Sequence, residues 1–565
     1  MSGVALRSHN WFGRKDLDGF AHRSWIKAEG FSDLMFDGRP VIGIANSWSE
    51  LTNCNAHLRT VAEAVKRGVL SAGGFPLEFP TISLGEVLMK PTTMMFRNLM
   101  AMDVEECIRA YPLDAVVLLA GCDKTTPAML MGAASADVPA VMVTGGPMLR
   151  GMWDGQTLGS GTDARKIWAQ RRAGEITDET MAEVEGCLSR SAGHCMVMGT
   201  ASTMAAMAET LGMALPGNAA IPAADSRRLV LAEHSGRLAV EMAKARGPKP
   251  SEILTADAFD NAIRADMAVG GSTNAIVHLT AIAGRVGVKI DLHRLNEVSD
   301  STPVLVDLKP TGQFYMSDLY AAGGVGAVLR ELKPLLHLEC MTVTGETLGE
   351  RLAHEEGAWV DRAVVRPLSD PLAKEGGLVA LFGTLAPNGA ILKRSAADAN
   401  LFEREGRAVV FSSLDDLAAR VDDPALDITA DDFMVLQNAG PKSGYAMPEA
   451  GYLPIPQKLA RAGLKDMVRI SDARMSGTAY GTIVLHVSPE AAAGGPLALV
   501  RNGDRIKLSV KQRKIDLLVA EKDLAERKKS WQPPVAVPAR GYAKLYMDHV
   551  LQAEHGCDFD FLRKS

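Results

Sequence analysis

Short apolar runs alternate with stretches of helical periodicity between residues 40 and 150, and this alternation constrains the fold more than any other feature. The apolar runs lie at 41–44, 115–120 and 141–143, and the helical stretches at 58–72 and 94–110. Apolar runs without polar alternation are typical of strands that are buried on both faces of a parallel sheet. The pattern therefore predicts an α/β domain in which helical crossovers cover a parallel sheet.

The rest of the chain divides into a helical part and a β-rich part. The pattern from about 195 to 285 is mostly helical, as at 227–246, and we expect these helices to pack on the first sheet. Closely spaced β-rich runs follow residue 375, at 378–382, 408–411, 433–436, 483–487, 497–500 and 505–510. Asn502-Gly503 predicts a hairpin turn between the last two runs. We expect an α/β domain at 1–375 with helical additions and a smaller β-barrel-like domain at 376–565.

Composition argues against several classes of function. The 61 Lys and Arg residues are balanced by 67 Asp and Glu residues, and the net charge of −6 leaves no basic footprint for nucleic acid or anionic lipid. The apolar runs are strand-sized, far below the roughly 18 to 20 residues of a membrane helix. The first 20 residues are polar and charged where an export signal is apolar. We expect a cytoplasmic protein that binds neither nucleic acid nor membranes.

The segment GCDKTTP at 121–127 carries the strongest chemical signal. It follows the expected strand at 115–120 and precedes a helical stretch, and ligands of open α/β sheets bind at such strand-to-helix turns. Cys122, Asp123 and Lys124 place a soft thiol, a hard carboxylate and an amine side by side. This combination is unusual in a structural turn and suits a site that handles two different metals. The alternative interpretation is an incidental turn with a buried cysteine.

Two further cysteines lie in polar or glycine-flanked turns. Cys54 follows the strand at 41–44 and Cys195 precedes a helical stretch, so both can converge with Cys122 at one edge of the sheet. Three cysteines without a CxxC pair can hold an iron-sulfur cluster that leaves one iron open, and zinc is the competing metal. Lone buried thiols are a further alternative. We interpret the other cysteines as core or surface residues, namely Cys107, Cys187, Cys340 and Cys557.

Carboxylates suited to a hard cation such as Mg²⁺ are Glu86, Asp123 and Glu449. An exposed loop carboxylate is the competing interpretation of either glutamate alone. The polar, glycine-punctuated segment 471–478 suits a loop over a pocket or a structural turn. The glycine turns at 145–147 and 270–274 can cradle an anion with backbone amides. Neither turn has the spacing of a nucleotide-binding loop, which argues against nucleotide binding.

Taken together, these motifs resemble the dihydroxyacid and sugar-acid dehydratase family over nearly the whole chain. The resemblance is carried by TNCN at 52–55, GCDKTTP at 121–127, GHC at 193–195, GGSTNA at 270–275, DARMSGTAYG at 472–481 and SPEAAAGGPLA at 488–498. Within the family, DARMSGTAYG is most similar to the pentonate dehydratases, of the arabinonate type. The resemblance implies small-molecule substrates and an assembly of two or four copies.

The resemblance also assigns residues. It implies that a [2Fe-2S] cluster with one open iron is held by Cys54, Cys122 and Cys195. It implies that Mg²⁺ is bound by Glu86, Asp123 and Glu449, and that Lys124 is carbamylated to become a further oxygen ligand. Ser476 matches the base that removes the C2 proton. The carbamate and the cluster would explain why a thiol, a carboxylate and an amine are adjacent at 122–124.

The implied reaction is the dehydration of 2,3-dihydroxy carboxylates, here aldonic sugar acids such as pentonates or gluconate, to 2-oxo-3-deoxy acids. The C3 hydroxyl would leave on a cluster iron. An alternative is dehydration of 2,3-dihydroxy-3-methylbutanoate in branched-chain amino acid synthesis, which the apolar loop at 85–89 favours. A third alternative, from another class, is a non-catalytic α/β protein that binds an anionic metabolite.

Overall fold

The computed structural model describes residues 6–534 and 538–564. Its N-terminal part contains a parallel sheet of four strands in the order β2-β1-β3-β4. The strands are β1 (Val41–Asn46), β2 (Phe75–Pro80), β3 (Ala115–Ala120) and β4 (Ala140–Thr144). All residues of β1, β3 and β4 are buried, as their uninterrupted apolar sequences predict. The parallel sheet is therefore confirmed.

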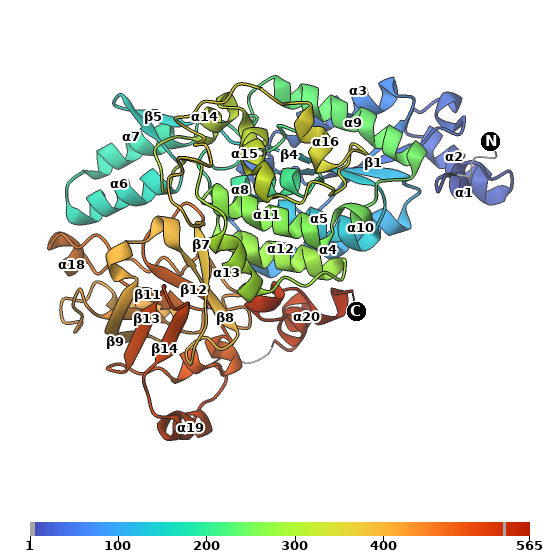
Figure 1. The fold of residues 1–565 in the computed structure, drawn as a ribbon. Coiled ribbons are helices and arrows are strands. Elements are labelled where there is room, and N and C mark those ends of the chain that lie inside the picture. The colour runs from blue at the N-terminus through green and yellow to red at the C-terminus, as the bar shows by residue number, and fades with distance from the viewer. Residues whose placement is uncertain (1–5, 535–537, 565) are drawn as a thin grey trace.

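Helices cover both faces of this sheet (Figure 1). On one face, α3 (Leu58–Ser71) packs against α9 (Arg227–Ala245), and on the other α5 (Thr125–Ala136) packs against α4 (Thr93–Ala110). The contact of α3 with α9 depends on glycine, because a Cβ atom at Gly68 would lie 1.9 Å from the carbonyl oxygen of Glu233. The prediction that helices of the 195–285 segment pack on the sheet is confirmed for α9.

A second helical layer lies over α5. It includes α8 (Thr200–Thr210), α11 (Ala256–Ala268) and α12 (Thr273–Arg285). Every residue of α8 and α12 is buried, because α12 packs against α5 and the C-terminal part of the chain and α8 packs among α5, α11 and α12. A separate pair, α6 (Thr162–Ala173) and α7 (Asp178–Leu188), projects from the body on the side of the barrel, where α6 contacts α18 (Gln457–Arg461).

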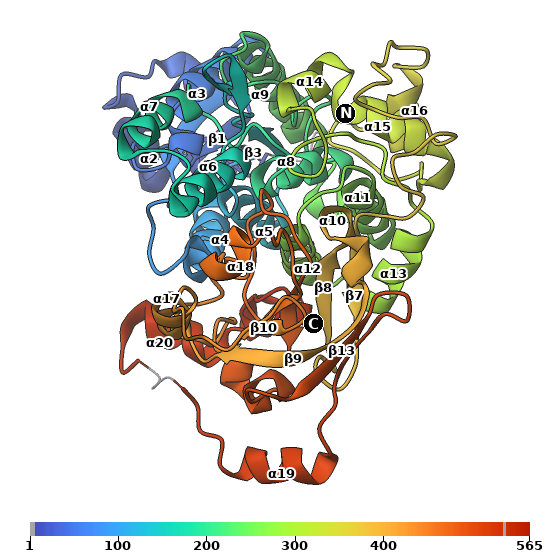
Figure 2. The same ribbon diagram turned by 90° about the vertical axis from the view of Figure 1, so that its left-hand side faces the viewer.

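The C-terminal part forms an eight-stranded, nearly closed barrel in the order β14-β13-β9-β10-β11-β12-β8-β7. Its strands are β7 (Leu378–Leu381), β8 (Gly389–Lys393), β9 (Glu403–Phe411), β10 (Phe433–Leu436), β11 (Arg469–Ser471), β12 (Ile483–Ser488), β13 (Arg505–Ser509) and β14 (Lys514–Leu517). Phe382 joins the two edges, since its amide donates to Arg513 and its carbonyl accepts from Ile515. Figure 2 shows β9 and β13 side by side across the barrel. The barrel-like fold is confirmed; the boundary at residue 375 stays a prediction.

One expected barrel strand is wrong. Residues 497–500 do not form a strand, because Pro496–Leu499 is a 3-10 helix that begins at a proline. The side-chain amide of Gln437 donates to the carbonyls of Leu497 and Val500, at 2.7 and 3.0 Å, and satisfies groups that a strand would have paired. Asn502-Gly503 therefore does not connect two paired strands. The strand after it, β13, pairs with β9 and β14 and not with residues 497–500.

Residues 556–558 return from the barrel to the N-terminal part and are anchored there by two buried arginines. Arg97 on α4 donates to the carbonyls of Gly556 and Cys557, at 2.7 and 2.9 Å. Arg285 at the end of α12 forms a two-pronged ion pair with Asp558, at 2.6 and 2.9 Å, and both side chains are fully buried. The two parts of the chain are thus joined through charged groups that have no access to water.

None of the helices in the described ranges combines the length and the apolarity that a bilayer crossing requires.

Candidate active site at the facing edges of the two sheets

Loops from both sheets meet between the two parts of the chain. Cys54 lies in a short 3-10 helix after β1, and Cys122 lies two residues after β3. Since β1 and β3 are parallel neighbours, both thiols lie at the carboxyl edge of the N-terminal sheet. In the barrel, β10, β11 and β12 are also parallel neighbours, and the loops after β10 and β11 carry Glu449 and Ser476. The site is therefore assembled from the carboxyl ends of strands in both sheets.

Hydrogen bonds hold the three cysteine loops together. The side chain of Asn55 accepts from the amide of Gly121 at 2.9 Å, which ties the Cys54 loop to the Cys122 turn. The carbonyl of Asn53 accepts from the amide of Gly193 at 3.2 Å, and the Asn53 side chain donates to Ser191 at 3.2 Å. The Cys195 loop is thus bonded to the Cys54 loop. The loops that carry the three cysteines are therefore bonded to one another.

The thiols interact with one another directly. A hydrogen bond with Cys122, together with burial and the charges of Cys122 and Cys195, raises the pKa of Cys54 well above its usual value. Burial, followed by the charge of Asp123, raises the pKa of Cys195 to about 12. The raised pKa values favour the protonated forms of Cys54 and Cys195 in the metal-free protein. A metal ion would remove these protons, because it deprotonates a coordinating thiol. A set of three converging thiols fits a soft metal centre.

The three predicted carboxylates also converge. One oxygen each of Glu86, Asp123 and Glu449 can be chosen so that all three lie within 4.8 Å of one another. They come from the turn after β2, the turn after β3 and the loop after β10. Hard oxygen ligands at this spacing suit a cation such as Mg²⁺.

The fully buried ammonium group of Lys124 lies at the centre of the carboxylates. Its Nζ atom is 2.9 Å from Glu86, 3.3 Å from Glu449 and 3.5 Å from Asp123. Burial and Arg474 lower the pKa of Lys124, but the three carboxylates outweigh them and raise it. Burial raises the pKa of Asp123 to about 6 despite Lys124. Burial opposes ionisation of Glu449 as well, but Lys124 and Arg474 hold its pKa at about 2.

Sequence reasoning missed Arg474, the second cation of this cluster. Its guanidinium is fully buried and lies 3.2 Å from Glu449 and 3.6 Å from Glu86, and it also donates to the carbonyl of Met447 at 2.8 Å. A buried arginine without such partners is costly, so it fixes the relative positions of the two glutamates. The signal was present in the sequence, because the arginine lies inside the polar segment 471–478.

Asn274 is the second missed residue. Its side-chain nitrogen donates to Glu449 at 3.1 Å, to the carbonyl of Met475 at 3.1 Å and to Thr200 at 3.0 Å. The glycine turn at 270–274 therefore contributes a side-chain donor to this site. The other glycine turn, at 145–147, receives a hydrogen bond from His57 at the Gly145 carbonyl, 2.8 Å away. Both contacts support the loops of the candidate active site.

Ser476 lies in the loop after β11, two residues after Arg474, and is half-buried. Gly477 presses its loop against the start of α8, where a Cβ atom would lie 2.6 Å from the amide nitrogen of Thr200. In the loop at 85–89, Glu86 faces Lys124, whereas the side chains of Val87 and Leu88 are exposed. The four remaining cysteines lie outside the site, and Cys557 among them is buried against Met447.

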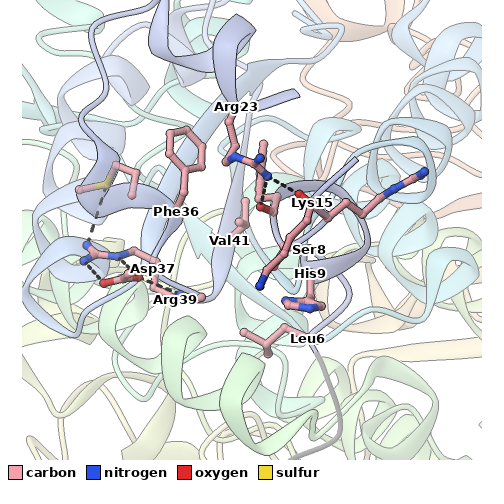
Figure 3. Close-up of a pocket in the computed structure, with 14 residues that line it drawn as sticks. Leu6, Ser8, His9, Lys15, Arg23, Phe36, Asp37, Arg39 and Val41 are labelled. Carbon is pink, nitrogen blue, oxygen red and sulfur yellow. Dashed lines mark hydrogen bonds and ion pairs between the residues drawn. The ribbon is translucent and has the colours of Figure 1, made fainter. Parts of the chain in front are cut away.

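A cavity of about 710 Å³ lies elsewhere, between the N-terminal helices and the beginning of β1 (Figure 3). Val41 lines it at the amino end of the strand, on the edge opposite to the cysteines. Two of its cations bond within the protein, since Arg23 donates to the carbonyls of Phe12 and Arg14 and Arg39 pairs with Asp37. This cavity is not part of the candidate active site.

Comparisons with known proteins give a consistent result. Residues 39–351 match the Dihydroxy-acid/6-phosphogluconate dehydratase N-terminal family, and residues 363–557 match the corresponding C-terminal family. The chain is 55% identical to the L-arabonate dehydratase of Azospirillum brasilense, over 99% of this chain and 97% of the relative. It is 46% identical to the 6-deoxy-6-sulfo-D-gluconate dehydratase of Pseudomonas putida (99% and 96% covered) and 41% identical to the dihydroxy-acid dehydratase of Pyrococcus abyssi (97% and 98% covered).

The two family matches together span most of the chain and include every residue of the site described above. The similarity to each of these three relatives extends over nearly the full length of both proteins. The chain therefore belongs to the dihydroxy-acid/6-phosphogluconate dehydratase family.

Proposed function

We propose that the protein is a hydro-lyase that dehydrates aldonic sugar acids to 2-oxo-3-deoxy acids. The observation that carries the proposal is the meeting of a soft thiol set and a hard carboxylate set at Cys122 and Asp123, two adjacent residues. Relatives that are 55% and 46% identical are named for an aldonate and a sulfo-aldonate. The relative named for a dihydroxy-acid is 41% identical, which favours a sugar acid for this chain.

The thiols would hold a [2Fe-2S] cluster and the carboxylates would hold Mg²⁺. Three thiols leave one iron without a protein ligand, so the cluster fits a substrate-binding role. When bound, the two centres would supply Lewis acids that make the C2 proton acidic and the C3 hydroxyl a better leaving group. The residues that hold them are Cys54, Cys122 and Cys195 for the cluster and Glu86, Asp123 and Glu449 for the magnesium ion.

The charge of the carboxylate cluster supports carbamylation of Lys124. As an ammonium group, Lys124 occupies the space among the three carboxylates and competes with a cation for their oxygens. Reaction of the ammonium group with carbon dioxide gives a carbamate and releases two protons, which replaces one positive charge with one negative charge. A divalent ion then adds two positive charges. The net charge of the buried cluster is therefore the same before and after the two changes, which avoids the cost of an uncompensated buried charge.

Ser476 would act as the base in the elimination. It takes the proton from C2, the electrons of the C2–H bond form the C2–C3 double bond, and the C3–O bond breaks as hydroxide leaves. The proton taken from C2 and this hydroxide together account for the water that is released, which returns Ser476 to its starting state. The resulting enol tautomerises to the 2-oxo acid. Ser476 supports this role because it is half-buried and follows Arg474, which contacts Glu449, by two residues. A serine hydroxyl is a weak base, so the surrounding cations have to favour its alkoxide.

The test is 2-oxo acid formation by anaerobically purified protein with Mg²⁺ across pentonates, hexonates, glycerate and 2,3-dihydroxy-3-methylbutanoate. We expect turnover of aldonates well above that of the branched acid. Preferred turnover of the branched acid would instead assign the protein to branched-chain amino acid synthesis. An iron-free, inactive protein would support a non-catalytic anion-binding role. The Ser476→Ala variant is expected to keep the cluster spectrum and to lose at least about 100-fold in kcat; retained turnover would exclude Ser476 as the base.

We also propose that the protein is a cytoplasmic homo-oligomer, of two or four copies. All seven cysteines are free, as in a reducing compartment. The N-terminal helix α2 (Leu17–Lys27) exposes Leu17, Phe20 and Trp25 with 78%, 66% and 79% of their surfaces accessible. Such a cluster of apolar side chains is typical of an interface. Light scattering after gel filtration should show a multiple of the 60.3 kDa chain mass, and a monomer would contradict this proposal.

A further inference from the structure

Two charged side chains, one from each part of the chain, are buried without a hydrogen-bond partner. Asp266 lies near the end of α11 and is 0% exposed, and Lys393 is the last residue of the barrel strand β8 and is 1% exposed. Within the described ranges, neither the two carboxylate oxygens of Asp266 nor the Nζ atom of Lys393 has a hydrogen-bond partner in the protein. Buried charges are paired or hydrogen-bonded in folded proteins, so both groups need a polar partner.

Each of the two groups is the charged neighbour of the other. Burial raises the pKa of Asp266 to about 8, and the charge of Lys393 opposes this shift. Burial also lowers the pKa of Lys393 to about 8, against the charge of Asp266. The two groups thus act on each other while they lie beyond hydrogen-bond distance. Polar groups at such a separation are commonly bridged by water.

The carboxylate of Asp266 lies against the glycine turn between α11 and α12. A Cβ atom at Gly271 would lie 1.9 Å from Asp266 Oδ1, so this position needs glycine to leave room for the carboxylate. From the barrel, the hydroxyl oxygen of Ser395 lies 3.6 Å from the position of a Cβ atom at Gly270. The amide of Ser395 donates to the carbonyl of Gly377 at 3.1 Å, and the amide of Gly377 donates to α11 at 3.2 Å. The segment after β8 is thus bonded to α11 beside the turn.

The same turn carries a donor to the carboxylate cluster. Ser272 caps α12, and its hydroxyl oxygen lies 2.9 Å from that of Thr200. Asn274 donates to Thr200 at 3.0 Å and to Glu449 at 3.1 Å. The turn that lies against Asp266 therefore also holds the amide that contacts Glu449. A displacement of this turn would weaken that contact.

The charges of the two groups select their common partner. A cation would be repelled by Lys393 and an anion by Asp266, whereas water can donate to a carboxylate and accept from an ammonium group. We propose that ordered water joins Asp266 and Lys393 into a buried pair that fixes the turn at 270–274. Through Asn274 the pair positions Glu449, so Asp266 and Lys393 are positioning residues. This last step rests on the proposed function, because it takes Glu449 as a magnesium ligand.

The first experiment tests the pair without any ligand. A crystal structure of the wild-type protein should show ordered water within hydrogen-bond distance of both Asp266 and Lys393. The urea midpoints of Asp266→Asn, Lys393→Met and the double variant are then compared with that of the wild type. The two single effects should not add, because the second change removes a partner that the first has already lost. A direct ion pair, a gap without water, or additive effects would overturn the water-bridged pair.

The second experiment measures Mg²⁺ binding by titration calorimetry to the full-length protein, purified anaerobically and freed of Mg²⁺. Asp266→Asn and Lys393→Met should each weaken binding about 10-fold, as is typical when a group behind a metal ligand is lost. Asn274→Ala should weaken it at least as much, because it removes the donor itself. Adding Asp266→Asn to Asn274→Ala should cause no further loss, since Asp266 acts through Asn274. The matched control is Asp257→Asn on α11, whose side chain is 66% exposed, and it should bind as the wild type does.

The outcomes separate this inference from the proposed function. If the wild-type protein binds no Mg²⁺, the proposed function fails and the positioning role with it, whereas the pair stands or falls on the first experiment. If the wild-type protein binds Mg²⁺ and dehydrates aldonates, but Asp266→Asn and Lys393→Met bind the ion equally tightly, the positioning role is overturned. It is also overturned if Asp266→Asn weakens binding by the same factor in Asn274→Ala as in the wild type, because its effect would then bypass Asn274.

Discussion

Replacing Asp123 with asparagine is expected to stabilise the metal-free protein while it removes one carboxylate of the site. Burial, with Glu449 and Glu86 nearby, raises the pKa of Asp123 from 3.8 to about 6 although Lys124 opposes the shift. A rise of about two units corresponds to about 3 kcal/mol at about 1.4 kcal/mol per unit. Above pH 6 the buried carboxylate of Asp123 is ionised and lowers the free energy of unfolding of the wild-type protein by this amount. The side chain of Asp123→Asn is neutral and has no such effect.

The sign of the pH dependence follows from the raised pKa. The folded protein binds the proton of Asp123 more tightly than the unfolded chain, so its stability falls as pH rises from about 4 to about 6. The advantage of Asp123→Asn should therefore grow over this range and stay constant above it. Magnesium at 1,000 times its dissociation constant should reverse the order, because its binding then stabilises the wild-type protein by about 4.1 kcal/mol, more than the advantage of about 3 kcal/mol that the variant has without metal.

The assay is urea unfolding of chelator-treated protein between pH 4 and 8, followed by tryptophan fluorescence, with and without Mg²⁺. Asp33→Asn serves as the control, because its side chain is 87% exposed and the change should stay within about 0.5 kcal/mol. If Asp123→Asn destabilises the metal-free protein at pH 7, or if its effect is the same at pH 4 and pH 7, the reasoning from the buried charge is refuted.

Two further predictions concern the thiols and the joint between the two parts of the chain. Cys122→Ser should abolish the visible absorbance and lower the iron content of anaerobically purified protein, whereas Cys107→Ser on α4 should leave both unchanged; an unaltered spectrum of Cys122→Ser would exclude Cys122 as a ligand. Arg285→Met should lower the free energy of unfolding by about 3 to 5 kcal/mol, because it leaves Asp558 as a buried unpaired charge, and a loss below about 1 kcal/mol in urea unfolding would contradict this.

The elements that local sequence determines were predictable. Strands such as β3 are apolar along their whole length, and α3 and α4 carry apolar residues at helical spacing, so their positions follow from the pattern. The strand predicted at 497–500 was wrong because of a residue distant in the sequence. The side chain of Gln437 binds the carbonyl groups that a strand would have paired. Closure of the barrel at Phe382 likewise depends on residues more than 130 positions away, which no local pattern reveals.

The residues of the candidate site likewise fall into those that the sequence reveals and those that only the folded structure reveals. Cys122 and Asp123 were recognisable as candidates because they lie side by side in a strand-to-helix turn, whereas the full sets of thiols and carboxylates were assigned through the family resemblance. Arg474 and Asn274 were not recognised, because arginine and asparagine are common on surfaces and become informative only when burial and a specific partner are known. Their roles arise from contacts between the two parts of the chain, which exist only in the folded protein.

The anchoring of residues 556–558 has a consequence for biosynthesis. Asp558 lies 273 residues after its partner Arg285, and Gly556 lies 459 residues after Arg97. While a ribosome is still making the barrel, Arg285 has Glu105 and Arg97 has Asn98 as partners, but both guanidinium groups lack the acceptors at 556–558 that complete their hydrogen bonds in the buried state. The interface of α4 and α12 with the barrel therefore cannot close during translation of the first part. This interface can form only after residues 556–558 have been synthesised. Until then its surface is exposed, and such exposed surface makes a nascent protein prone to aggregation.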